Sequence, residues 1–315
     1  MLRARTSAPL FFALAALWPA PAGATYSIVA ADKASRQVGG AITSCVTPIV
    51  PHFPEGLGIV YGASPGHGVI AAQAYLDAPR FRGKTRAIEL LSMDTDPAHI
   101  LAIITSKDID PSPEVRQYAI VDLLGRAAGY TGAGADDYKE DRQGAVGSFV
   151  YSVQGNLLTS GRVLDQAAAA FEGDGCDLAD RLMRALEAGG QNGEGDRRCT
   201  GPHGIPSDNA FLQVDREGEP AGSYLKLDVL DLASQSPLPE LRRQFDAWRA
   251  AHPCPAPAVV DAGASSGSAA SGLGPQGTSE QPSGCCLTSG TAGRALLPPL
   301  ALLVLALVAW RRRAR

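Results

Sequence analysis

The sequence lacks the short motifs that mark several common classes of enzyme. It contains no CxxC pair, which argues against a cysteine-based zinc or redox site. Its five histidines show no HExxH spacing, so a metalloprotease centre is not expected. The glycine-rich run GASPGHG, residues 62–68, matches neither a P-loop nor GxGxxG. We therefore predict neither a metal ion nor a cofactor.

The central part of the chain also has few basic residues. The 315 residues include 28 Lys and Arg against 32 Asp and Glu, a net charge of −4. The two ends carry seven of the arginines and no acidic residue, which leaves residues 25–284 with 21 basic and 32 acidic side chains, a net charge of −11. A protein that binds the phosphate backbone needs the opposite sign and a basic stripe. We expect no nucleic-acid partner.

The N-terminus resembles a secretory signal. Arg3 and Arg5 precede the apolar run PLFFALAALW, and residues 22–24 have the small-x-small form that signal peptidase accepts. The apolar run is too short to span a membrane. We predict that residues 1–24 are a signal peptide and that the mature chain begins at Thr25; the alternative is an uncleaved anchor.

The C-terminus has two parts. Residues 254–284 are rich in Pro, Ala, Gly and Ser, which predicts a flexible linker. Residues 285–315 begin with Cys285 and Cys286, continue with a short apolar run and end with RRRAR. This order resembles the MYXO-CTERM sorting tail. The resemblance implies a sorting protease that removes the helix, lipid modification at one Cys, preferably Cys285, and display at the cell surface or outer membrane. A plain membrane anchor is the alternative.

Four cysteines remain between these ends. An even number in an exported chain permits two disulfides, and four cysteines allow three pairings. Cys176 and Cys199 flank a predicted helix, which favours a bond between them and a second bond from Cys45 to Cys254. The other pairings stay open.

Residues 25–253 show no internal boundary and predict one α+β domain. The strands are nearly continuous in apolar residues, so both faces need cover. Two stacked sheets with helices outside satisfy this, as does one mixed sheet with helices on each face. The predicted strands are 25–32, 38–45, 67–76, a hairpin over 114–132 that turns near Gly125, 147–158, 209–217 and 224–231. The predicted helices are 83–93, 96–106 with Asp96 as cap, 160–173, 176–190 with Asp177 as cap, and 238–252.

Several runs in this domain occur in a familiar order. The runs are TYSIVAAD, VGGAITS, AAQAY, VRQYAIVD, AGYTG, VQGNLL and GDRR. Their order and spacing resemble the domain-of-unknown-function family 1028, which is assigned to the N-terminal-nucleophile (Ntn) hydrolase-like proteins. The resemblance covers about residues 25–252 and implies a four-layer αββα sandwich. After GDRR this chain has CTGPHGIPSDNAFL, where the family commonly has a GRQSAAL-like run, so the family's features there do not carry over.

The resemblance gives Thr25 a chemical role. A threonine hydroxyl is a poor nucleophile without a base, and a free α-amine with a pKa near ~8 supplies one on the same residue. Cleavage before Thr25 would free that amine. The sequence thus predicts an exported, surface-anchored amide hydrolase that acts on a small amide or peptide. A non-catalytic module that binds cell-wall or peptide ligands is the alternative, and a purely structural surface protein is a third reading. In both, Thr25 is only the first residue after processing.

Six other residues are candidates for support of this site. Each also has an ordinary structural interpretation: a strand-end serine, a buried amide that needs partners, turn chemistry around Gly155, or a solvated loop. The candidate roles are a hydrogen bond to the Thr25 amine (Ser44), a substrate contact (Gln73), an oxyanion contact (Gln154 and Asn156), and an ion pair at the pocket border (Asp196 with Arg197).

Overall fold

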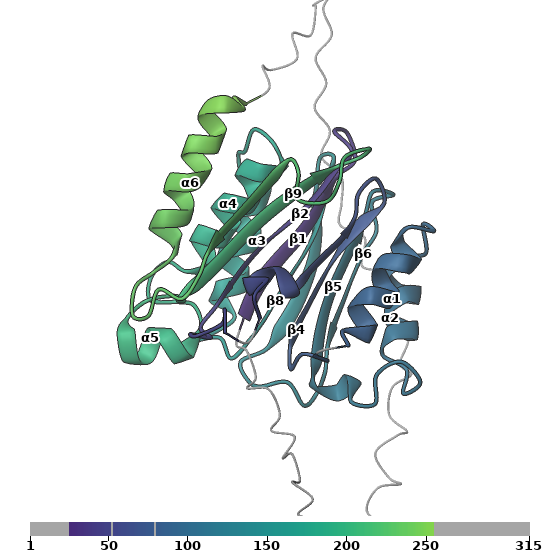
Figure 1. Ribbon diagram of the computed structural model, residues 1–315, viewed down its shortest axis with the longest axis horizontal. Coiled ribbons are helices and arrows are strands. Elements are labelled where there is room, and N and C mark those ends of the chain that lie inside the picture. Colours follow the sequence, from purple (N-terminus) through teal and green to yellow (C-terminus); the bar gives the residue numbers. More distant parts are fainter. Residues whose placement is uncertain (1–24, 52, 79, 255–315) are drawn as a thin grey trace, which may run out of the picture. The chain divides into compact units, whose positions relative to one another are not determined.

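The computed structural model describes residues 25–51, 53–78 and 80–254 (Figure 1). These residues fall within one unit of the chain, Met1–Ala258. No helix among them is long and apolar enough to cross a membrane. The predicted signal peptide, nearly all of the predicted linker, and the tail with Cys285 and Cys286 lie outside the described residues.

Ten strands form two antiparallel sheets. The six-stranded sheet has the order β10-β9-β2-β1-β8-β7 and the four-stranded sheet the order β3-β4-β5-β6. The strands of the larger sheet are β1 (Thr25–Asp32), β2 (Gln37–Ser44), β7 (Glu140–Val146), β8 (Phe149–Asn156), β9 (Asn209–Arg216) and β10 (Leu225–Val229). Those of the smaller sheet are β3 (Tyr61–Ser64), β4 (Gly68–Ala74), β5 (Arg116–Asp122) and β6 (Ala127–Thr131).

Six α-helices and two short 3₁₀-helices complete the described part of the chain. Two of the predicted caps are confirmed: the Asp96 side chain accepts from the Ala98 N–H, and the Asp177 side chain from the Asp180 N–H. The helices are α1 (Arg82–Leu91), α2 (Pro97–Ile104), α3 (Arg162–Glu172), α4 (Leu178–Gly189), α5 (Arg197–His203), α6 (Leu238–Ala251), η1 (Gly56–Ile59) and η2 (Pro113–Val115).

Three apolar clusters explain why the strands are apolar on both faces. In β1, Tyr26, Ile28 and Ala30 pack toward α3, α4 and α6, because successive residues of a strand point to opposite faces. The alternating residues Val29 and Ala31 pack against the smaller sheet. A third cluster lies between the smaller sheet and helices α1 and α2. Of the two arrangements that composition allowed, the chain adopts the one with two sheets.

Two strands and one α-helix were not predicted from the sequence, besides the two short 3₁₀-helices. Strand β7 has the polar sequence EDRQGAV and lies at a sheet edge, so it shows no apolar alternation. Strand β3 has only four residues. Helix α5 contains Gly201 and Pro202, which disfavour helices, and yet it begins at a capping aspartate, Asp196. The interpretation of this last region as a solvated loop was wrong.

The preferred disulfide pairing was also wrong. The bonds join Cys45 to Cys199 and Cys176 to Cys254, with Cα–Cα distances of 5.8 Å and 5.6 Å. Cys199 lies within helix α5, ten residues beyond the end of α4, and Asp196 at the start of α5 accepts from the Cys45 N–H. This contact places Cys199 beside Cys45 and leaves Cys176 to pair with Cys254.

Candidate functional site

Three strand ends meet at Thr25. In the antiparallel register, Thr25 at the start of β1 pairs with Ser44 at the end of β2 and with Asn156 at the end of β8. All three side chains are buried. The Thr25 hydroxyl donates to Ser44 Oγ, with 3.2 Å between the oxygens. The hairpin thus brings two of the predicted residues into direct contact, and the third lies on the neighbouring strand.

Two buried glutamines link the sheets beside Thr25. Gln73 Nε2 donates to the Thr25 carbonyl oxygen at 3.0 Å and to Gln117 Oε1 at 3.0 Å. Gln117 Nε2 in turn donates to the Gly155 carbonyl oxygen at 2.8 Å. Gln117 was missed, although it carries the same signal as Gln73, a buried amide within an apolar strand. The pair holds the backbone of β1 and β8 at a fixed distance from the smaller sheet.

Gln154 lies between the sheets and away from the cavity described below. Its Nε2 donates to the Ala71 carbonyl oxygen at 3.4 Å, and its Oε1 is buried with no partner among the described residues. A Cβ at Gly155 would lie 2.5 Å from Leu158 Cδ1, so a larger residue there would force the buried Leu158 side chain to shift. Neither Gln154 nor Asn156 is among the described residues that line the cavity.

The predicted ion pair between Asp196 and Arg197 is wrong, because the partner is Arg198. Asp196 accepts from the Arg198 N–H at the start of α5 and pairs with its guanidinium at 3.0 Å, while Arg197 is exposed. The Asp196 carboxylate also accepts from the Cys45 N–H at 2.8 Å. Full burial raises the pKa of Asp196, and the Arg198 guanidinium opposes that rise. The carboxylate joins α5 to the end of β2.

A cavity of about 670 Å³ opens beside Thr25. This volume lies within the range of small-molecule sites, roughly 300–1,000 Å³. Three predicted residues line it: Thr25, Ser44 and Gln73. The other lining residues are Cys45, Val46, Thr47, Pro48, Ile49, Phe53, Leu57, Ile59, Val60, Ala74, Leu76, Arg198, His203, Asp208, Ala233 and Ser234.

Backbone strain accompanies the site. Ala74, a cavity residue next to Gln73, has φ 70°, and Leu157, next to Asn156, has φ 54°. For a residue with a Cβ, this left-handed conformation is less stable by roughly 1–2 kcal/mol. Residues in such conformations are concentrated at functional sites. The sequence carries no signal for either position.

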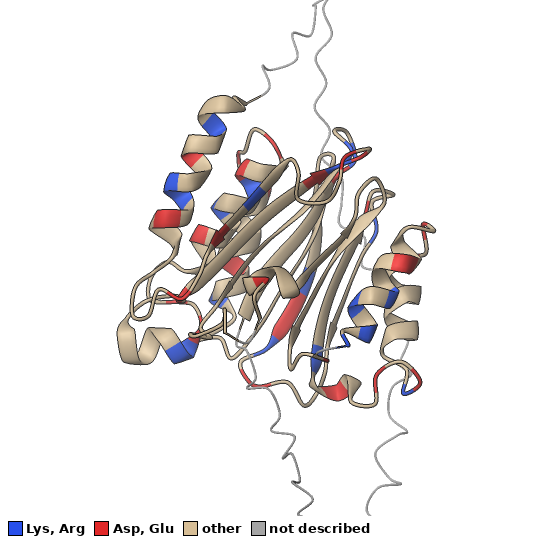
Figure 2. Ribbon diagram, in the orientation of Figure 1, with Lys and Arg blue, Asp and Glu red and all other residues tan. Residues whose placement is uncertain are grey.

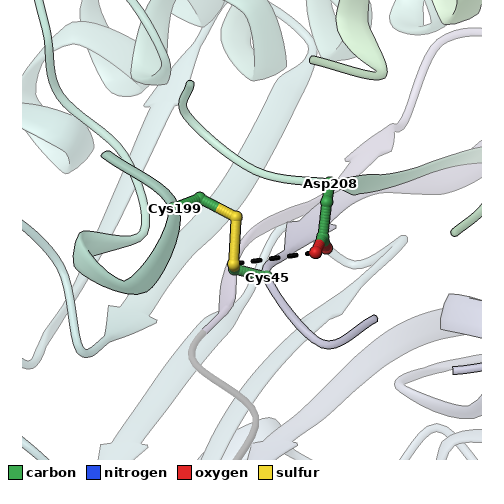
Figure 3. Close-up of side chains that lie close together, drawn as sticks. All are labelled: Cys45, Cys199 and Asp208. Carbon is green, nitrogen blue, oxygen red and sulfur yellow. Dashed lines mark hydrogen bonds between the residues drawn. A yellow bond between two sulfur atoms is a disulfide. The ribbon is translucent and has the colours of Figure 1, made fainter. Parts of the chain in front are cut away.

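One group of side chains has the ligand types of a metal site. Cys45, Cys199 and Asp208 have their sulfur and carboxylate atoms within 4.8 Å of one another (Figure 3). Metals bind the thiolate form of cysteine, and here the two sulfurs are joined in a disulfide. The Asp208 carboxylate, 3.7 Å from Cys45 Sγ, accepts instead from the Val46 N–H and from Asn209 Nδ2. The oxidised arrangement gives this group a structural role.

An α/β-hydrolase serine was not expected from the sequence, on the ground that GxSxG is absent; that ground was wrong, because the run GASPG, residues 62–66, has this spacing. It forms the turn of the β3–β4 hairpin rather than a turn from a strand into a helix. His67 Nδ1 lies 2.9 Å from Asp94 Oδ1. Among the described residues, no hydrogen bond joins the Ser64 side chain to the His67 ring. This run does not build a catalytic triad.

Comparison with known proteins shows a family but no activity. No curated protein matches the chain. The crystal structure of protein SPO2555 from Silicibacter pomeroyi, described as a DUF1028 protein, is similar in fold with a TM-score of 0.55. It shares 24% sequence identity, and the match covers 72% of this chain and 89% of that chain. Residues 25–241 match the family described as "Family of unknown function (DUF1028)". The chain therefore belongs to the DUF1028 family.

Proposed function

We propose that the two sheets and their outer helices are the four-layer αββα sandwich of Ntn hydrolase-like proteins, and that the protein is an amide hydrolase with Thr25 as its nucleophile. One observation carries the proposal: the Thr25 hydroxyl, in contact with Ser44, lies at the start of a strand and at the wall of a cavity of about 670 Å³. A strand-initial threonine needs only cleavage of the preceding bond to gain a base on the same residue.

The reaction would follow from that dyad. Thr25 Oγ1 attacks the carbonyl carbon of the amide, and its proton passes to the free α-amine. The tetrahedral intermediate collapses to an ester on Thr25, and the leaving amine takes the proton back. Water then hydrolyses the ester with the same amine as base.

The surrounding residues position this dyad. Gln73 fixes the Thr25 carbonyl oxygen, and the Ser44 hydroxyl lies within hydrogen-bond reach of Thr25 Oγ1. Asn156, at the end of β8, is the candidate for the oxyanion contact, which requires its buried side chain to turn toward the cavity. Arg198 stays paired with Asp196 at the cavity border.

Export and surface anchoring are part of the proposal. Two disulfides within residues 45–254 suit an oxidising compartment. Residues 1–24 would direct export through signal peptidase, and residues 285–315 would anchor the protein through its tail. Mass analysis of the exported protein should give Thr25 as the first residue. A different first residue would contradict the nucleophile assignment.

Three variants test the dyad. Thr25→Ala keeps the amine and removes the nucleophile, whereas one residue added before Thr25 keeps the hydroxyl and displaces the amine. Each should abolish turnover of an amide substrate, and Thr25→Ser should keep part of it. Thermal melting serves as the control for folding. If the extended protein turns over substrate as fast as the native one, the α-amine is not the base.

The cavity also favours the second candidate function, a binding module for cell-wall or peptide ligands. A pocket of this size serves binding without chemistry equally well. In that case Thr25→Ala keeps full ligand affinity, and the native protein shows no turnover of that ligand.

A further inference from the structure

We propose that the substrate is an amide with an apolar acyl group, and that the cavity beside Thr25 holds this acyl group. The inference rests on the proposed function, since it assigns the half of the substrate that Thr25 would carry as an ester. The composition of the cavity wall and its position beside the strand ends support this inference.

The wall is mostly apolar. Ten of the nineteen lining residues have apolar side chains, and they come from the loop after β2, from η1 and from the ends of β4 and β10. Apolar surface of this kind gains free energy by covering hydrocarbon and offers a polar peptide side chain no partner. The ten residues are Val46, Pro48, Ile49, Phe53, Leu57, Ile59, Val60, Ala74, Leu76 and Ala233.

The apolar part of the wall begins two or three residues along the chain from the polar residues that contact Thr25. Val46 follows Ser44 by two residues, and Leu76 follows Gln73 by three. The Val60 carbonyl oxygen accepts from the Ala72 N–H at 2.9 Å, which fixes η1 next to β4. After the amine leaves, the acyl group stays bonded to Thr25. It must therefore pass Ser44 and Gln73, which contact Thr25, before it reaches the apolar residues that make up the rest of the wall.

The wall is also held in place before any ligand binds. Three carboxylates from distant segments accept the backbone N–H groups of residues 45–50. Asp196 accepts from Cys45 and Asp208 from Val46, while Asp231 accepts from Ile49 at 2.6 Å and from Val50 at 3.2 Å. A preformed wall costs less ordering when the ligand binds. Binding of an apolar chain should thus be measurable without a chemical step.

The charged groups at the cavity are compensated by the protein itself. Arg198 pairs with Asp196, and Asp208 accepts from two N–H donors. His203 Nδ1 lies 3.3 Å from the Ser234 hydroxyl. A site for an acidic or basic acyl group would present an uncompensated charge of the opposite sign. This cavity favours a neutral chain.

Binding is tested on the Thr25→Ala variant by calorimetric titration with acetamide, butanamide, hexanamide and octanamide. Each added methylene should lower Kd about threefold, since buried hydrocarbon dominates the affinity. Affinity that is independent of chain length, or that is greatest for acetamide, would overturn the inference.

Substitutions of residues in the cavity wall test where the acyl chain lies. Phe53→Ala should weaken octanamide binding about tenfold and leave acetamide binding nearly unchanged, because only the long chain reaches that part of the wall. Val46→Phe should shorten the preferred chain, and it replaces the first variant if Phe53→Ala does not fold. Leu124→Ala is the control, since Leu124 is 59% exposed and does not line the cavity. Equal effects of all three substitutions would contradict the assignment.

Turnover separates this inference from the proposed function. The native protein is assayed with p-nitroanilides of acetate, butyrate, hexanoate and octanoate. Chain-length-dependent binding without any turnover supports the apolar site and overturns the hydrolase. Turnover that is fastest for the acetyl compound keeps the hydrolase and overturns the apolar site. Binding and turnover that rise together with chain length support both, and the absence of both overturns both.

Discussion

The polar side chains at the two ends of β1 differ in their surroundings. At the Thr25 end, the polar side chains of Thr25, Ser44, Gln73 and Gln117 are buried and bonded to one another or to backbone. At the Asp32 end, the ion pair of Arg36 with Glu217 is largely exposed. Buried polar groups are costly unless they are satisfied, and exposed pairs contribute little. Buried polar groups also occur at the Asp32 end, where Asp32 accepts from the Ser35 and Ser148 hydroxyls, but it is at the Thr25 end that buried polar groups line the cavity.

Each end also has one disulfide. Cys45–Cys199 joins the end of β2 to α5 beside the cavity (Figure 3). Cys176–Cys254 joins the start of α4 to the end of α6. Helix α4 runs between the two ends: Gly189 lies against Tyr26, while the Arg181 guanidinium lies 4.5 Å from the centre of the Phe149 ring, and Phe149 pairs with Asp32. The two bonds therefore stabilise different ends of one sheet.

Surface charge does not distinguish a binding face. Basic and acidic side chains are interspersed along the outer helix α6, whereas in α1 three basic residues precede Glu89 (Figure 2). Several are paired on their own helix, such as Arg86 with Glu89 and Arg243 with Glu240. The two ends of β1 therefore differ in their buried groups and not in their surface charge.

The largest expected effect is on the disulfides. In the chain-entropy description, loops of 154 and 78 residues correspond to roughly 5 and 4.5 kcal/mol, so replacement of either pair by serine lowers stability by similar amounts. Only Cys45→Ser with Cys199→Ser should also weaken ligand binding at the cavity. Non-reducing peptide maps and denaturant unfolding measure both effects. Equal loss of binding in both double variants would show that the two disulfides do not differ in their effect on the cavity.

A smaller effect is expected at Asp196. Asp196→Ala removes a buried acceptor from the Cys45 N–H, the cap of α5 and the partner of Arg198, and should cost about 3 kcal/mol in the free energy of unfolding. The control at the other end is Arg36→Ala, whose unfolding midpoint should stay within experimental error because the pair is exposed. Similar losses in the two variants would contradict the comparison.

The glutamine bridge should contribute less. Gln117→Leu removes the donor to the Gly155 carbonyl oxygen and the acceptor of Gln73, at a cost of about 1–3 kcal/mol. The released Gln73 should also lower kcat, because it positions the Thr25 backbone. Gln143→Leu, at an exposed position of β7, is the matched control. A Gln117 variant with native stability and native kcat would show that the bridge is dispensable.

The smallest effect concerns a carboxyl group on β10, an edge strand of the larger sheet. Burial raises the pKa of Asp228, in β10, to about 6, and its Oδ1 has no partner among the described residues. Since the folded pKa exceeds the unfolded value near ~4, the stability from this group is present below pH ~4 and is lost as the pH rises through about 6. Asp228→Asn should therefore be more stable than the native protein at pH 7, by about 1 kcal/mol for a partly exposed group.

Thermal melting from pH 4 to pH 8 measures this difference. The gap between Asp228→Asn and the native protein should close toward pH 4. Glu240→Gln is the control of opposite sign: hydrogen bonds from Arg243 lower the pKa of Glu240 to about 2, so its carboxylate stabilises the fold above the unfolded pKa and this variant should not gain stability at pH 7. A gap that does not change with pH would assign the stabilisation to packing rather than to ionisation.

The sequence by itself determined the local structure of most of the domain. The β1–β2 hairpin, the turn at Gly125 with φ 91°, and the caps at Asp96 and Asp177 all follow from patterns that act within a few residues. Thr25 and Ser44 could be placed near each other for the same reason, since a hairpin fixes its own register.

Only the tertiary structure decided the contacts between distant segments. The disulfide partners, the choice of Arg198 over Arg197 at Asp196, and the bridge from Gln73 to Gln117 depend on how helices and sheets pack, which no local pattern encodes. The cavity is the clearest case, because its wall is built from segments up to about two hundred residues apart. Side chains that are ordinary loop residues in sequence form one surface there, since burial rather than sequence proximity brings them together.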